Sequence, residues 1–254
     1  MNSAALDVSI LWPAFAAGLL VTVTHVPLGM QVLQRGIVFI DLAIAQIAGL
    51  GVIMADFAGF EPQGWAAQGF ALLAAVAGAL LLTWTEKRWP DIQEALIGVS
   101  FVLAASGALL LVASNPHGGE HLKDLLVGQI LWVKPPTLAL VALVYAALIG
   151  IWMVRGRHAG RIAFYLIFAC TVTISVQLVG LYLVFTTLIV PALATRGLAH
   201  HRVAWGCALS AAGYILGLLT STLTDLPSGP AIVWVMTAIA VASLGWTRRP
   251  TMRA

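Results

Sequence analysis

Three polar side chains lie inside apolar stretches of the chain, where burying a polar group costs free energy. Asp41 is the only carboxylate that interrupts such a stretch, residues 36–55. Gln46 follows five residues later, which places it about 140° around a helix from Asp41, and His25 lies in the preceding stretch. A carboxylate in a membrane by default lines a water-filled path or pairs with a partner. Carboxylate and imidazole are also ligands for a divalent cation such as zinc. Asp41 is therefore a candidate polar group of a translocation path, and Asp41 and His25 are candidate metal ligands if they face each other.

Each of these residues also has a simpler interpretation. Asp41 lies only six residues after Arg35, so it could anchor its helix near the membrane surface. Gln46 could bond to a neighbouring helix, and His25 to a nearby carbonyl. The sequence leaves both interpretations open.

A second cluster, His117, Glu120 and His121, follows an apolar stretch. Its order, H-x-x-E-H, is that of a metalloprotease motif, whose chemistry needs both histidines on one helical face. Gly118 and Gly119 oppose such a helix, so we do not expect protease activity. A loop that attracts cations, forming an outer vestibule, is the functional alternative to an ordinary solvated loop.

The composition requires a membrane around these residues. Of 254 residues, 61% are hydrophobic and only 9% are charged, with a mean hydropathy of +0.98, whereas soluble domains carry about 25% charged residues. This excludes a soluble enzyme, a disordered chain and a disulfide scaffold. A net charge of +3 is not a nucleic-acid signal here, because basic residues in membrane proteins mark cytoplasmic ends. We expect one all-α transmembrane domain over residues 1–254, with eight or nine helices.

Gaps between charged residues predict the positions of these helices. The charge-free stretches are 8–34, 62–85, 95–119, 135–154, 162–195, 203–224 and 226–247, and the stretch containing Asp41 is added to them. The stretch 162–195 is too long for one span. Gly180 and Pro191 are candidate breaks within it, so we expect a broken or short helix near 181–197.

The distribution of basic residues decides whether residues 162–195 are counted as one helix or as two. If the chain turns back near Gly180, eleven of the thirteen Lys and Arg residues fall on one side of the membrane. The positive-inside rule then places the N-terminus outside and the C-terminus in the cytoplasm, with nine helices. The segment 121–134 is expected to be a short amphipathic or re-entrant piece on the outer side.

The chain contains no G-x-x-x-x-G-K-[ST] motif, which ATPases use to hold phosphates. We therefore expect no enzymatic activity in this chain. If transport is driven by ATP, a separate subunit hydrolyses it.

Three stretches together resemble a known family. The first match covers residues 27–41 and 50–52, which carry PLG, an arginine, an aspartate and LGV. The second covers residues 91–101 and 125–131. The third covers residues 179–192 together with DLPSG at 225–229, and it is the most specific for the family because order and spacing both fit. The sequence resembles the permease subunits of the zinc and manganese ABC importers, the ABC-3 family, as in bacterial high-affinity zinc uptake.

The resemblance implies a type II-like importer in the bacterial inner membrane. It implies two copies of this permease, two cytoplasmic ATPase subunits that bind ATP, and an extracytoplasmic metal-binding protein. It also implies a coupling helix for the ATPase around Val190–Arg202. The residues expected to couple are Pro191, Ala194, Arg196, Gly197, His200, His201 and Arg202.

The sequence departs from the family at the second helix, where members carry an Asp and a His one turn apart as metal ligands. Alignment on Leu50-Gly51-Val52 puts Gln46 at the histidine position, and alignment on Asp41 puts Ala45 there. A glutamine amide oxygen suits manganese better than zinc, and His25 could replace the lost imidazole. Zinc is the expected cargo, ahead of manganese or iron. A metal chelate and a stand-alone ion-coupled carrier are the alternatives.

Overall fold

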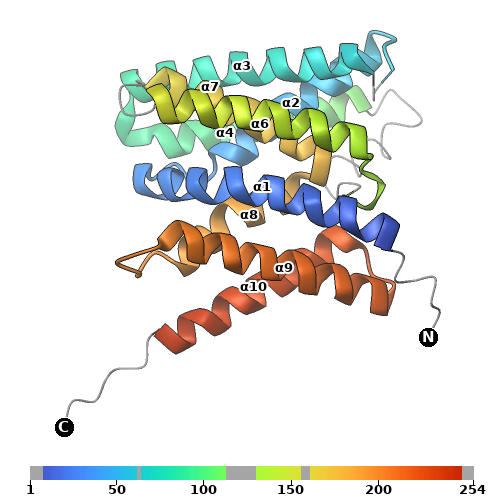
Figure 1. The fold of residues 1–254 in the computed structure, drawn as a ribbon. Coiled ribbons are helices and arrows are strands. Elements are labelled where there is room, and N and C mark those ends of the chain that lie inside the picture. Colours follow the sequence, from blue (N-terminus) through green and yellow to red (C-terminus); the bar gives the residue numbers. More distant parts are fainter. Residues whose placement is uncertain (1–7, 62–63, 113–129, 156–160, 248–254) are drawn as a thin grey trace.

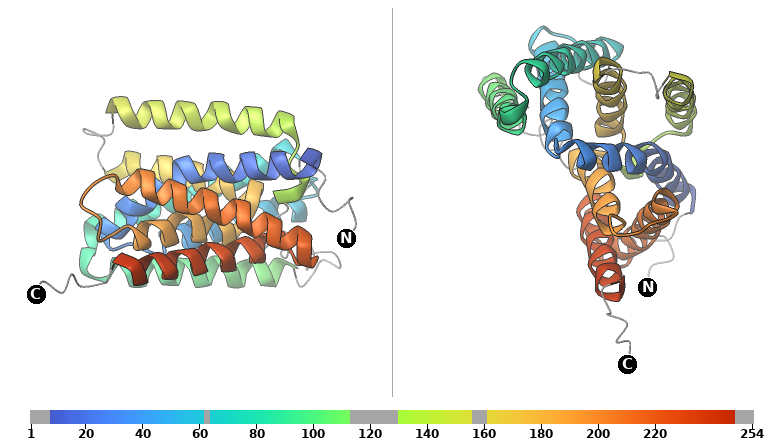
Figure 2. Two further views of the ribbon diagram at one scale, coloured as in Figure 1. Left: turned by 60° about the horizontal axis from the view of Figure 1, so that its bottom comes forward. Right: turned by 90° about the vertical axis from the view of Figure 1, so that its left-hand side faces the viewer.

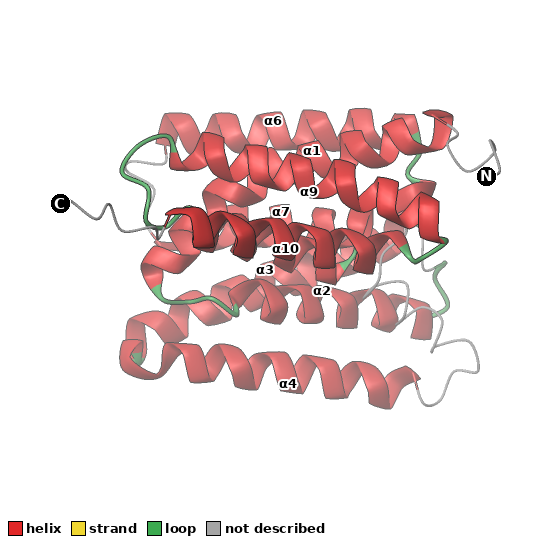
Figure 3. Cartoon of the chain, turned by 90° about the horizontal axis from the view of Figure 1, so that it is seen from below, coloured by secondary structure: helices red, strands yellow, loops and turns green. Residues whose placement is uncertain are grey.

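The computed structural model describes residues 8–61, 64–112, 130–155 and 161–247. Across these ranges the chain is helical and contains no β-strand (Figures 1 and 3). The α-helices are α1 (Val8–Arg35), α2 (Ile40–Phe57), α3 (Trp65–Arg88), α4 (Gln93–Val112), α6 (Pro135–Arg155), α7 (Arg161–Val179), α8 (Leu181–Ala194), α9 (Arg202–Thr224) and α10 (Ser228–Thr247). Two short 3-10 helices, η2 (Pro90–Ile92) and η3 (Ile130–Trp132), precede α4 and α6.

The lengths of these helices fit a bilayer. In the described part of the chain, 7 helices are long and apolar enough to cross a membrane, and α8 and α10 are shorter apolar helices. The helix boundaries follow the charge gaps because Asp, Glu, Lys and Arg are costly in hydrocarbon. The predicted all-α polytopic fold, with about nine helices and a short one near 181–197, is confirmed.

The long apolar stretch is divided at Gly180. This residue has φ +87°, a conformation that favours glycine because other residues meet steric strain there. The Gly180 N–H donates to the Val176 carbonyl at 2.8 Å, and the Val184 N–H donates to the Gly180 carbonyl at 3.1 Å. Gly180 thus has both of its own backbone groups satisfied, as hydrocarbon requires. Pro191 does not end α8, which continues to Ala194.

The turn at Gly180 sends α8 back towards the end of the bundle at which α7 begins (Figure 1). The described chain consequently starts and finishes at opposite ends of the bundle (Figures 1 and 3). The end that carries the C-terminus also holds most of the described basic residues, because Arg35 ends α1, Lys87 and Arg88 end α3, and Arg161 begins α7. The predicted alternation of basic loops therefore agrees with the path of the chain.

The helices pack as two groups with α1 between them (Figure 2). On one side, α8, α9 and α10 pack against one another, and α1 packs on α8 and α9. On the other side, α2 packs on α3 and α4, and α3 packs on α7.

Small residues allow close approach within the first of these groups. A Cβ atom on Gly29 of α1 would lie 1.8 Å from the backbone oxygen of Leu188 in α8, so the two backbones touch. On α9, Gly213 and Gly217 are one turn apart and contact Met236 and Ile232 of α10. Such small-residue spacing is typical of helix pairs in membranes.

Candidate functional site

Asp41 is the second residue of α2 and is completely buried. Neither of its carboxylate oxygens has a hydrogen-bond partner among the described residues. The first turn of a helix exposes N–H groups and the positive end of the dipole, which favours a negative charge. Asp41 is thus a buried acceptor beside the first N–H groups of its own helix, and no side chain in the described part of the chain neutralises it.

The turn that leads to Asp41 is held by a residue from α4. Glu94, in the first turn of α4, accepts a hydrogen bond from the Phe39 N–H at 3.3 Å. This bond satisfies a donor just ahead of α2 and fixes the entrance of that helix. Glu94 therefore acts on Asp41 by positioning its helix.

Gln46 lies in the same helix and is half-buried. Because α2 is helical through both residues, Gln46 stays about 140° from Asp41 around the axis. The two side chains therefore face different neighbours, as the spacing predicts.

His25 is completely buried in α1. Its Nδ1 lies 3.1 Å from the Val21 carbonyl and 2.9 Å from the Thr24 hydroxyl, while Nε2 has no partner among the described residues. The simpler interpretation, a histidine bonded to a nearby carbonyl, thus describes one ring nitrogen. The other nitrogen is left without a bond.

The structure does not bring His25 and Asp41 together. His25 lies ten residues before the end of α1 at Arg35, a rise of about 15 Å, whereas α2 starts at that same end of the bundle. The two helices also pack mainly on different partners. Among the described residues, no three His, Cys, Asp or Glu side chains are grouped closely enough to hold a metal ion. His117, Glu120 and His121 lie outside the described residues.

The expected coupling segment has no helix of its own. Pro191 and Ala194 belong to α8, residues 195–201 form a turn, and Arg202 begins α9. The expectation of a separate helix around Val190–Arg202 is therefore wrong, because α8 continues through Pro191 and the Thr195 N–H and hydroxyl both donate to the Pro191 carbonyl.

The turn is closed by a bond across it. The Arg202 Nε donates to the Thr195 carbonyl at 3.1 Å, and His201 adopts a left-handed conformation with φ 55°. The remaining expected residues project from the surface of this turn and are exposed: Arg196, Gly197, His200 and His201.

Polar contacts between helices escaped the sequence prediction. Thr22 of α1 and Ser210 of α9 share a buried hydrogen bond of 2.8 Å, and Thr187 of α8 bonds Tyr214 of α9 at 2.9 Å. A further bond joins Tyr145 of α6 to Ser175 of α7. Hydroxyl residues in apolar runs are a weak signal, since most bond their own helix backbone.

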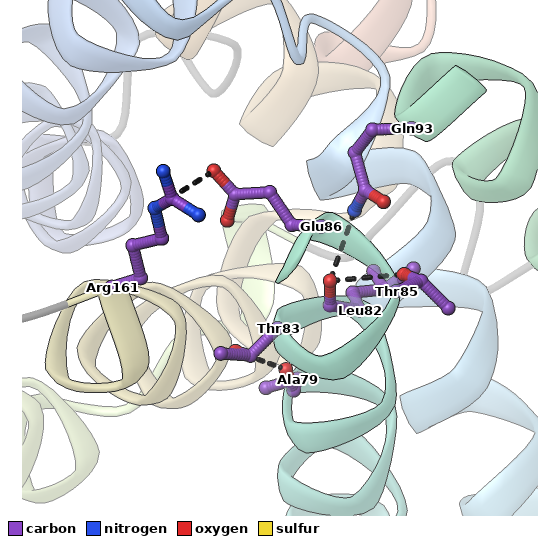
Figure 4. A network of polar contacts seen from close by, with 7 residues as sticks. All are labelled: Ala79, Leu82, Thr83, Thr85, Glu86, Gln93 and Arg161. Atoms are coloured by element: carbon purple, nitrogen blue, oxygen red, sulfur yellow. Dashed lines mark hydrogen bonds and ion pairs between the residues drawn. The ribbon is translucent and has the colours of Figure 1, made fainter. Parts of the chain in front are cut away.

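Charged residues at the C-terminal end of the bundle form a second set of missed contacts. Glu86 of α3 pairs with Arg161 of α7 at 3.6 Å, and Gln93 donates to the Leu82 carbonyl (Figure 4). Arg35 of α1 lies 4.1 Å from the ring centre of Phe164 in α7. The sequence shows Glu86, Arg161 and Arg35 only as loop charges, although their contacts join α1, α3 and α7.

The fold and its buried carboxylate define an α-helical membrane protein with several spans. The model of the ABC 3 transport family matches residues 7–159 and 157–246, which together cover most of the chain. The chain belongs to the ABC 3 transport family.

Two curated relatives match nearly the whole chain. One is the high-affinity zinc uptake system membrane protein ZnuB of Haemophilus influenzae, 25% identical, with 92% of this chain and 97% of the relative covered. Another is an uncharacterized membrane protein of Synechocystis, 24% identical, with 96% and 93% covered.

Two solved structures share the fold. PsaBC of Streptococcus pneumoniae, in complex with Fab, has a TM-score of 0.74 at 18% identity, with 96% of this chain and 95% of that chain covered. An ABC transporter described as metal-chelate type, in an inward-facing conformation, has a TM-score of 0.67 at 14% identity, covering 93% and 85%.

Proposed function

We propose that this chain is the permease subunit of an ABC importer that moves a divalent metal ion across the bacterial inner membrane. Zinc is the first candidate, ahead of manganese and iron, because a relative over nearly the full length is named as a zinc uptake protein. The observation that carries the proposal is Asp41, a buried carboxylate with no partner among the described residues. Such a group is costly in a membrane, and where one occurs it usually marks a substrate or ion pathway.

In this proposal the cargo passes Asp41, which supplies a charged oxygen ligand. Gln46 offers an amide oxygen and His25 an imidazole nitrogen at another depth, so the ion meets them in succession and not in one shell. His117, Glu120 and His121 remain the predicted outer vestibule. Successive weak sites suit transport, because a cargo must also leave each of them.

The family supports an assembly around this chain. We propose that residues 1–254 form one permease domain that pairs with a second copy of itself. Cytoplasmic ABC ATPase subunits bind and hydrolyse ATP, and an extracytoplasmic metal-binding protein delivers the ion. This chain itself is then no enzyme, binds no nucleic acid, and contacts lipid along its spans.

The proposed orientation places the C-terminus in the cytoplasm, since the basic residues gather at that end of the bundle. The turn at 195–201 then faces the ATPase, and Pro191, Ala194, Arg196, Gly197, His200, His201 and Arg202 form the proposed coupling surface.

A cysteine at Ala199, which is exposed in this turn, tests orientation and coupling together. A membrane-impermeant maleimide is expected to label Ala199→Cys only in inside-out vesicles, and bound ATPase subunit should slow that labelling. Asp225→Cys, at the opposite end between α9 and α10, is the matched control. It should label only from outside and at an unchanged rate, with Cys170 and Cys207 replaced by Ser in both variants. Labelling of Ala199→Cys from outside would contradict the orientation.

One alternative cargo is a metal chelate. It is favoured by the separation of His25 from Asp41 and by the absence of a three-residue metal cluster in the described part of the chain. A chelated metal brings its own ligands and needs few from the protein. A stand-alone ion-coupled carrier, the other alternative, would need no ATPase.

Uptake into proteoliposomes separates these functions. The permease is reconstituted with its ATPase and delivery protein, and zinc, manganese and a ferric chelate are supplied in turn with ATP inside. Zinc uptake that requires ATP is the expected result. Uptake of the chelate alone would replace the free ion as cargo, and equal uptake by the permease without ATP would establish a carrier.

A further inference from the structure

A groove lies between α3 and α7 at the end of the bundle where α3 finishes. It has a volume of about 580 Å³ and is lined by Lys87, Arg161, Ile162, Ala163 and Leu166. The exposed lining is almost entirely apolar, so Lys87 and Arg161 contribute mainly their aliphatic stems to the groove. This pattern differs from the metal path, where the polar groups are a carboxylate, an amide and an imidazole.

The groove carries a net positive charge. The Arg161 side chain is 54% exposed and lies 3.6 Å from Glu86, which is itself only 16% exposed (Figure 4). Lys87 is exposed and has no ion pair within the described ranges. Glu86 therefore pairs with Arg161, and the positive charge of Lys87 is left without a described partner that an anion could provide.

The apolar floor lies at the edge of the membrane. Ile162 is 44% exposed and lies in the first turn of a helix that is long and apolar enough to cross a membrane. Trp84 and Trp89, on either side of Lys87 in the sequence, are also exposed and pack edge to face at 5.3 Å. Exposed tryptophans are enriched where hydrocarbon meets headgroups, so the cations lie at headgroup level and the floor at acyl-chain level.

We propose that this groove binds an anionic phospholipid. Its phosphate lies between Lys87 and Arg161, and an acyl chain follows Ile162 and Leu166 down the groove. Basic pockets between membrane helices are suited to such headgroups. A zwitterionic lipid fits less well, because its own ammonium group meets the two cations. The ATPase is a poorer occupant, since the turn proposed to face it lies across the bundle from α3 (Figure 1).

Native mass spectrometry of the detergent-purified protein tests this site. Phosphatidylglycerol, phosphatidylcholine or inorganic phosphate is added in turn. The wild type is expected to retain one phosphatidylglycerol, and Lys87→Gln to retain about fivefold less, as expected for loss of one lysine near a membrane surface. Arg88→Gln is the matched control, because Arg88 is the next residue on the same helix but lies over Trp89 and does not line the groove. Ala163→Phe, which fills the floor and keeps both cations, should lose the lipid too.

Three results would overturn the proposal. Equal retention by Lys87→Gln and Arg88→Gln would remove the groove as the site. Displacement of the lipid by inorganic phosphate alone would make it a soluble-anion site. A loss of ATPase binding in Lys87→Gln, with lipid retention unchanged, would assign the groove to the ATPase. None of these outcomes depends on which metal is transported.

Discussion

Asp41→Asn is expected to lower zinc uptake more than about tenfold, since even the loss of an outer-shell partner of a metal ligand costs 10–100-fold. The amide keeps the volume of the carboxylate and removes its charge. Because the carboxylate is buried with no partner among the described residues, its removal relieves a desolvation cost, and the thermal midpoint of unfolding should hold or rise. Uptake into proteoliposomes and thermal unfolding in detergent measure the two effects.

Asp91→Asn is the matched control, because Asp91 is an exposed carboxylate at the same end of the bundle. It should leave uptake unchanged. Asp41→Glu, which keeps the charge, should retain part of the activity. Wild-type uptake in Asp41→Asn would remove Asp41 from the metal path, and a lower thermal midpoint would assign it a structural role.

Gly29→Ala is expected to destabilise the protein by about 3 kcal/mol or more, at the upper end of what overpacking costs. The added methyl group would lie 1.8 Å from the Leu188 carbonyl oxygen, which is backbone and cannot rotate away. The helices α1 and α8 must then separate along their contact. A lower thermal midpoint and a smaller yield of folded protein in detergent are the measurable results.

Gly69→Ala provides the comparison, because Gly69 is a helical glycine of α3 with open space around its Cβ position. Alanine there should be neutral or stabilise the helix by about 0.5–1 kcal/mol. If both variants unfold at the same temperature, the backbone contact at Gly29 does not limit stability.

The positions of the helices could be predicted from charge alone. The stretch 135–154 became α6, 203–224 became α9, and 162–195 was divided at Gly180. Charge predicts the helices because placing a charged residue in hydrocarbon costs several kcal/mol. This cost depends only on the segment that carries the charge, so no knowledge of helix packing is needed. Pro191 was the weaker prediction, because α8 passes through it.

The site was predicted only in part. Asp41 was singled out because it is the one carboxylate in an apolar stretch, and the structure buries it completely. Its part in a metal path stays a prediction. His25 lies about 15 Å along α1 from the end at which α2 begins, so the two side chains differ in depth. The two helices also pack mainly on different partners, through contacts between residues distant in sequence such as Gly29 and Leu188. The support of Asp41 by Glu94 was likewise hidden, because 55 residues separate Phe39 from its partner.

In the proposed importer, the short helix α8 would act as a lever. Its 14 residues form a rod of about 21 Å, with a joint at Gly180 and another at the turn 195–201. One backbone approach of α8 to α1 falls at Leu188, about 10 Å from one end of α8 and about 9 Å from the other. If α8 pivots at this approach, a push on the turn swings Gly180 by a similar amount in the opposite direction. Work done at the turn by the proposed ATPase would thereby appear as displacement of Gly180, about 21 Å away along α8.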